Sequence, residues 1–228
     1  MTTNKNTMSL KYKNDDEKDP SHLPDVLPGF EHINRYWDKH TKMHAVKILP
    51  GQYYVTRGPE MIVTVLGSCI SACVRDKVSG IGGMNHFLLP LSRDGKDHWR
   101  ANDPSAATRY GNYAMEHMIN DILSHGGRRR LLEIKICGGG RVLQEMKFIN
   151  IGQKNIDFVK DYILTEGLNL IGEDVGGVYP RKVQYLPTTG ELRIKKLRTM
   201  HNDTIIKREL EYERGLEEKP VSGDVELF

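Results

Sequence analysis

The sequence MIVTVLGSCISACVRDKVSGIGGMNHFLLP, residues 61–90, decides the fold of this chain. Its two apolar runs flank the polar residues 76–80, a pattern typical of a β-hairpin. A two-residue turn at residues 77–78 places Cys69 directly opposite His86, with Cβ atoms ~5 Å apart. A three- or five-residue loop shifts the pairing by one residue, and a bulge or twist must then restore a shared face. The sequence thus predicts a thiol and an imidazole side by side in one sheet.

A thiol beside an imidazole is the minimum for nucleophilic catalysis. The thiolate is the attacking species, and an adjacent imidazolium can lower the pKa of a thiol from ~8.5. Gly67 and Ser68 place the thiol just after a glycine turn, where the sulfur can be exposed and the N–H groups near Ser68 and Cys69 can hold an oxyanion. The alternative is that Cys69 is a small buried apolar residue and His86 a structural histidine. The residues alone leave both interpretations open.

Zinc is a second interpretation of the same residues, since Cys69 and Cys73 could join His86 or Cys137. Positions four apart in a strand are separated by ~13 Å, however, and zinc–sulfur bonds of ~2.3 Å cannot bridge that distance. The triplet Gly138–Gly140 follows a predicted strand but lacks the lysine and the spacing of a phosphate-binding loop. We therefore expect no metal site, and a tight turn or close backbone packing at the glycines.

Composition indicates a globular protein of one domain. The chain has 228 residues, of which 38% are hydrophobic and 28% charged, and its net charge of +3 is too small to indicate nucleic-acid binding. Apolar runs of the ~20 residues that cross a bilayer are absent, and the N-terminal residues do not resemble a signal peptide. Three cysteines, an odd and small number, argue against a disulfide framework. We expect a cytoplasmic protein without membrane insertion.

The order of patterns predicts one mixed α/β domain over residues 28–198. Residues 1–27 are expected to be a disordered arm, in front of an aromatic segment that packs onto the domain, and residues 199–228 a charged, mobile tail. Asp103 and Pro104 mark the start of a helix, and the glycines at 126 and 127 mark its end. The predicted elements are β-structure over residues 44–87, helices over 104–125 and 152–168, and strands over 131–137, 168–177, 181–187 and 191–197.

Ordered blocks along residues 28–198 resemble the CheD family of bacterial chemoreceptor glutamine deamidases. The blocks are LPGFEHINRYWDK, ILPGQYYVT, VTVLGSCISACVRD, GGMNHFLLP, TRYGNYAME, KICGGG, IGQKN, EDVGG with RKV, and PTTGELRIKKL. The resemblance implies an α+β fold, a mixed β-sandwich flanked by helices like the catalytic domain of cytotoxic necrotizing factor toxins. It also implies Cys69 as nucleophile, His86 as base and Thr64 as the third member of a triad.

The activity that the resemblance implies is deamidation of selected glutamines in the cytoplasmic helices of chemoreceptors. It implies hydrolysis of glutamyl methyl esters there as well, and a CheC-type phosphatase as a partner. Such chemistry proceeds through a thioester and needs no metal or organic cofactor. Two alternatives stay open: a non-catalytic adaptor that binds the phosphatase or a receptor, and another cysteine hydrolase such as a protease or a transglutaminase-like enzyme.

Overall fold

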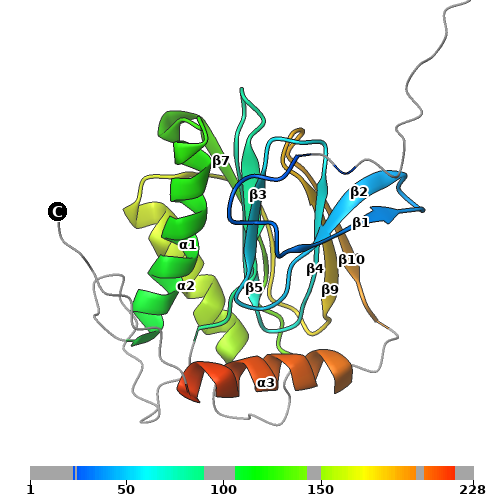
Figure 1. Ribbon diagram of the computed structural model, residues 1–228. Coiled ribbons are helices and arrows are strands. Elements are labelled where there is room, and N and C mark those ends of the chain that lie inside the picture. The colour runs from blue at the N-terminus through cyan, green and yellow to red at the C-terminus, as the bar shows by residue number, and fades with distance from the viewer. Residues whose placement is uncertain (1–22, 24, 90–105, 143–149, 199–202, 219–228) are drawn as a thin grey trace, which may run out of the picture.

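The structure is a computed structural model that describes residues 23, 25–89, 106–142, 150–198 and 203–218. Two β-sheets lie face to face, and helices α1 (Ala106–Ser124) and α2 (Ile151–Thr165) cover the outer face of one of them (Figure 1). Helix α3 (Asp203–Glu218) runs across one end of the two sheets (Figure 1). The fold is therefore mixed α+β, with helices, one sheet and the other sheet as successive layers.

The described residues form two five-stranded sheets. Their strands are β1 (Asn34–Asp38), β2 (Met43–Lys47), β3 (Tyr53–Thr56), β4 (Met61–Leu66), β5 (Ile70–Asp76), β6 (Gly82–Asn85), β7 (Leu132–Gly138), β8 (Asn169–Val175), β9 (Arg181–Leu186) and β10 (Glu191–Lys196). Sheet A has the order β1-β2-β4-β9-β10 and sheet B the order β3-β6-β5-β7-β8. The pairs β2–β4 and β7–β8 are parallel, and all other neighbours are antiparallel. Consecutive strands β4 and β5 belong to different sheets, so the segment between them crosses the sandwich.

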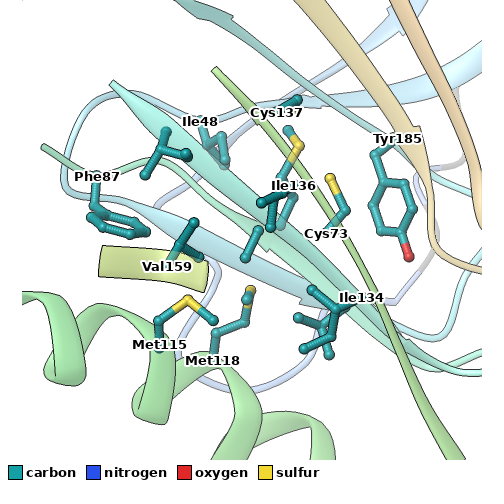
Figure 2. Close-up of a cluster of buried hydrophobic side chains, with 14 of the residues drawn as sticks. Ile48, Cys73, Phe87, Met115, Met118, Ile134, Ile136, Cys137, Val159 and Tyr185 are labelled. Carbon is teal, nitrogen blue, oxygen red and sulfur yellow. The ribbon is translucent and has the colours of Figure 1, made fainter. Parts of the chain in front are cut away.

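One hydrophobic core joins the two sheets and the helices. Figure 2 shows Met115 and Met118 of α1 within it, near Val159 of α2. Tyr185 of sheet A and Cys73 of sheet B lie close together in the same cluster. Packing on both faces of sheet B explains why its central strand β5 is buried at nearly every position, whereas the first part of β7 alternates between buried and half-buried residues. The periodicity of α1 and α2 follows from the same requirement, since each helix has one face against this sheet.

The predicted elements after the hairpin are confirmed, with ends shifted by a few residues. Helix α1 ends at Ser124, where Gly126 takes the left-handed conformation at φ +95°, as the glycine stop signal predicts. Asp103 and Pro104, the expected start of this helix, lie outside the described residues. A 3₁₀ turn at Arg129–Leu131 then leads into β7. The aromatic segment contains a strand that the sequence analysis did not assign, β1 at the edge of sheet A.

The hairpin β5–β6 is confirmed, but its predicted register is wrong. Its loop has four residues, 77–80, because the Asp76 carboxylate accepts hydrogen bonds from the N–H groups of Val78 and Ser79 and Gly80 turns at φ +74°. Ile70 consequently pairs with Phe87, and this register puts Cys69 and His86 on either side of that pair rather than opposite each other. A shift of two residues keeps both on the same face of the sheet.

The segment expected to be a mobile tail contains helix α3. Charged residues outnumber apolar ones in this sequence, but the helix is anchored by a buried carboxylate, Glu209, and by Tyr212, which packs against the core. Of the expected disordered arm, residues 1–22 and 24 lie outside the described residues, as do residues 199–202 and 219–228 of the tail.

Candidate active site

Cys69 belongs to the segment Gly67–Cys69, here called the nucleophile loop, which crosses from β4 of sheet A to β5 of sheet B. Its three carbonyl groups are held by the surrounding protein. Gly140 N–H donates to Gly67 O (2.8 Å), the Asn155 side-chain amide to Ser68 O (2.9 Å), and Gly139 N–H to Cys69 O (2.7 Å). The loop backbone is therefore fixed from one side along its whole length.

The glycine triplet 138–140 is explained by this close approach. A Cβ atom at Gly138 would lie 2.3 Å from Cys69 O, and one at Gly140 would lie 2.9 Å from Gly67 O. Gly138 and Gly139 also have φ values of +120° and +65°, which disfavour other residues. The expectation of close backbone packing at these glycines is confirmed.

The N–H groups of the nucleophile loop all point to one anion. A trans peptide directs its N–H away from its C=O, so the bonds that hold Gly67 O and Ser68 O aim the N–H groups of Ser68 and Cys69 to the opposite side. There they meet the carboxylate of Glu209 from α3. Gly67 N donates to it at 2.8 Å, Ser68 N at 2.9 Å, Cys69 N at 3.2 Å and the Ser68 hydroxyl at 2.7 Å. The loop thus forms a cradle of converging donors that binds negative oxygen.

His86 is oriented by Thr64 from the facing sheet. The Thr64 hydroxyl donates its single proton to Ile48 O at 2.9 Å and lies 2.8 Å from His86 Nδ1. Because that proton is used, Thr64 Oγ1 can only accept from His86, so Nδ1 carries the ring proton. The other ring nitrogen, Nε2, is then a basic lone pair. Among the described residues it has no hydrogen-bond partner although it is buried.

Burial lowers the pKa of His86 to about 3 in this conformation. The imidazole is therefore neutral at physiological pH, the form in which a general base acts. Water reaching the ring would remove part of the desolvation and raise this pKa towards its ordinary value.

Cys69, His86 and Thr64, three residues that the sequence analysis selected, lie at one end of the sandwich, and all three are buried. The expectation of an exposed sulfur is wrong for this structure, in which Cys69 is 0% accessible. A cavity of about 510 Å³ adjoins the site and is lined by Thr64, His86 and Glu209, together with residues of sheet A and α3. The base and the bound carboxylate therefore border the same space.

Two residues of the site were missed by the sequence analysis. Asn155 is fully buried in α2, and besides holding Ser68 O it accepts a hydrogen bond from Leu89 N–H at 2.9 Å. An asparagine among the apolar positions of a helix is a signal for such a role, since a buried amide must find partners. Glu209 gives no such signal, because glutamate in a charged helix is normally a surface residue.

The part of the chain that the structure describes contains neither a cluster of metal ligands nor a helix suited to span a membrane. No three His, Cys, Asp or Glu side chains come together there in a way that would hold a metal ion. None of the helices in the same ranges combines the length and the apolar character that a bilayer span requires.

Comparison with known proteins gives concordant matches. Residues 88–196 match the family model described as CheD chemotactic sensory transduction. A protein of Halorhodospira halophila named probable chemoreceptor glutamine deamidase CheD is 57% identical over 90% of this chain and 94% of its own length. Proteins with the same name from Hahella chejuensis and Methylobacillus flagellatus are 50% and 53% identical, over 94% and 86% of this chain and 100% and 95% of their own lengths. A match over 90% of the chain necessarily includes Thr64, Cys69 and His86, which precede the range of the family model.

Proposed function

Because the chain belongs to the CheD family, we propose that it is a chemoreceptor glutamine deamidase with Cys69 as nucleophile and His86 as base. The observation that carries the proposal is the arrangement around the nucleophile loop. One side chain offers a thiol, three successive N–H groups converge on negative oxygen, and an imidazole held by Thr64 keeps an unpartnered lone pair within the described residues. These are the parts that hydrolysis of an amide requires.

The first half of the reaction forms a thioester. His86 Nε2 takes the proton of the Cys69 thiol, and the sulfur attacks the side-chain amide carbon of a substrate glutamine. The amide oxygen becomes an oxyanion held by the N–H groups of the nucleophile loop. The C–N bond then breaks, and His86 returns its proton to the nitrogen, which leaves as ammonia.

The second half hydrolyses the thioester. Water loses a proton to His86 Nε2 and attacks the thioester carbon, the C–S bond breaks, and the sulfur recovers the proton. The substrate is left as glutamate. Thr64 acts throughout as a positioning residue, since its hydroxyl accepts from Nδ1–H and stabilises the imidazolium formed in each half. The same steps would release methanol from a glutamyl methyl ester.

The proposal includes the setting of the reaction. A receptor glutamine that becomes glutamate gains a negative charge, which can bias a signalling equilibrium. The substrate segments that the family resemblance implies are cytoplasmic, so we place the protein in the cytoplasm. The two stacked sheets with flanking helices support the implied likeness to cytotoxic necrotizing factor catalytic domains. A CheC-type phosphatase partner is tested by gel filtration of the two purified proteins together.

The decisive experiment incubates the purified protein with a chemoreceptor cytoplasmic fragment and maps the product by mass spectrometry. Deamidation adds about one dalton at each modified glutamine and releases ammonia, whereas a protease cuts the chain and a non-catalytic adaptor changes nothing. Cys69→Ala serves as the matched control. New glutamates that appear equally with Cys69→Ala would refute the proposal.

A further inference from the structure

Glu209 occupies the cradle where the proposed reaction develops its charge. The cradle binds the carboxylate through all three N–H groups of the nucleophile loop and through the Ser68 hydroxyl. Among the described residues, no lysine, arginine or histidine forms a salt bridge with Glu209. A buried anion held by backbone N–H groups and one hydroxyl is a marker of a site built for negative oxygen.

The chemistry of the occupant matches the chemistry of the product. Deamidation converts a glutamine side chain into a glutamate side chain, and Glu209 is a glutamate side chain presented from a helix to the loop that carries Cys69. It is 2% accessible and lines the cavity that also contacts His86. Its position therefore reproduces the enzyme–product complex within a single chain.

Helix α3 closes the site as well as filling it. Tyr212, one helical turn after Glu209, pairs its hydroxyl with that of Tyr110 from α1. Its ring also lies against Gly51, where a Cβ atom would come within 2.5 Å of the Tyr212 hydroxyl. Cys69 is 0% accessible in this arrangement. Glu209 occupies the N–H groups of the nucleophile loop, so a substrate side chain cannot reach them until α3 moves away.

Several of the side chains described on α3 are exposed and charged. Lys207, Arg208, Glu211 and Arg214 are exposed, and among the described residues α3 makes few contacts with any other helix or strand. An element held in this way has a low cost of local opening compared with the strands of the core.

We propose that α3 is an internal product mimic, in which Glu209 fills the subsite for the substrate's glutamyl side chain and the helix covers the groove that receives a helix bearing the substrate glutamine. This inference rests on the proposed function, because it identifies the subsite with the reacting side chain. The enzyme is closed while α3 is seated, and it accepts a glutamine presented from a helix when α3 leaves.

The sharpest test makes the helix a substrate. In Glu209→Gln the side chain keeps its shape and its amide oxygen can accept from Gly67 and Cys69 N–H. Its NH₂ group can donate to the Ser68 hydroxyl, but it no longer accepts from Ser68 N–H, so one of the four hydrogen bonds of the carboxylate is lost. We expect the introduced glutamine to be converted to glutamate in the purified protein, with a mass increase of about one dalton in the peptide that contains it. The double variant with Cys69→Ala should keep its glutamine. Glu211→Gln, an exposed position on the same helix, should also stay unmodified.

A second measurement uses the opened enzyme. Glu209→Ala removes the carboxylate, so apparent KM for the receptor fragment should fall. For an open state populated at about 1–10%, the fall is roughly 10- to 100-fold. Glu211→Ala is the matched control and should keep the wild-type KM.

The outcomes separate this inference from the proposed function. The product-mimic inference is overturned if the glutamine of Glu209→Gln persists in a protein that deamidates the receptor fragment. It is also overturned if KM is unchanged in Glu209→Ala. Neither result contradicts the proposed deamidase function. Failure of the wild type and of Glu209→Ala to deamidate any receptor fragment overturns the proposed function itself.

Discussion

Replacing Thr64 by valine tests whether the hydroxyl that faces His86 has a function in catalysis. Valine has nearly the shape of threonine but can neither accept from His86 Nδ1–H nor donate to Ile48 O, two contacts of 2.8 and 2.9 Å in the structure. Both Thr64 and His86 are buried, and they border the cavity of the site, where a water molecule can replace only part of the hydrogen bonding of the lost hydroxyl. The substitution therefore removes one specific hydroxyl and leaves the packing nearly unchanged.

The magnitude follows from the charge that His86 gains during the reaction. A hydrogen bond to a charged group is worth about 1.5–3 kcal/mol, and each 1.36 kcal/mol changes a rate tenfold. The loss in kcat/KM is therefore roughly 10- to 150-fold. The unfolding free energy should fall by only about 1–3 kcal/mol, from the buried Nδ1–H and Ile48 carbonyl that lose their partner.

The assay measures ammonia release from a receptor fragment across a range of pH. Thr64→Ser restores the hydroxyl, and it should recover most of the activity, whereas a purely structural role of the Thr64 methyl group would leave serine as defective as valine. The pH profile of Thr64→Val should also differ from that of the wild type, because the tautomer and basicity of His86 are no longer fixed. A valine variant within about twofold of wild-type kcat/KM would refute the role assigned to Thr64.

Three further predictions concern the nucleophile, its loop and the hairpin. Cys69→Ala and His86→Ala should each abolish ammonia release while thermal unfolding stays cooperative, because nucleophile and base act as a unit; substantial activity in either variant contradicts the mechanism. Asn155→Ala leaves Ser68 O and Leu89 N–H without partners, and it should lower both kcat and the unfolding free energy, the latter by about 1–3 kcal/mol in urea denaturation; wild-type kcat would show that the loop needs no support from α2. Burial opposes ionisation of Asp76, but hydrogen bonds from Ser79, Val78 and Arg128 outweigh it and lower the pKa of Asp76 to about 2. A lowered pKa in the folded state stabilises the protein above the unfolded-state value, so about 2 kcal/mol should be lost between roughly pH 4 and pH 2. Asp76→Asn should lack this dependence, and an identical acid unfolding curve would contradict the assignment.

The parts of the fold that sequence reasoning predicts are those where one face of an element is buried. The helices α1 and α2 and the strands after the hairpin follow from apolar periodicity and glycine signals, because the core imposes both. The hairpin register differs by two residues, since the side chain of Asp76 and the conformation of Gly80 set the loop length, and neither is visible in a hydrophobic pattern. A register error of two residues does not move a side chain to the other face of a sheet, because side chains alternate between the faces with a period of two. The expectation that Cys69 and His86 share a face therefore does not depend on this error.

The parts that sequence reasoning missed are held by polar contacts. Helix α3 has few apolar residues among many charged ones, and it is bound to the nucleophile loop by a carboxylate whose partners are 140–142 residues away in the chain. Asn155 likewise acts through hydrogen bonds to the nucleophile loop and to Leu89. Such contacts carry no local periodicity, so they become visible only when the fold brings the loop and the helices together.

The occupied cradle also bears on how a deamidase releases its product. N–H groups arranged to hold an oxyanion will also hold the carboxylate that the reaction leaves behind, so catalytic stabilisation and product retention depend on the same donors. A glutamate within the same chain competes for those donors at an effective concentration on the order of millimolar, whereas each product carboxylate reaches them only from its own receptor. Return of Glu209 to the cradle after each turnover would therefore favour departure of the product, and the same contacts that close the resting enzyme would complete its cycle.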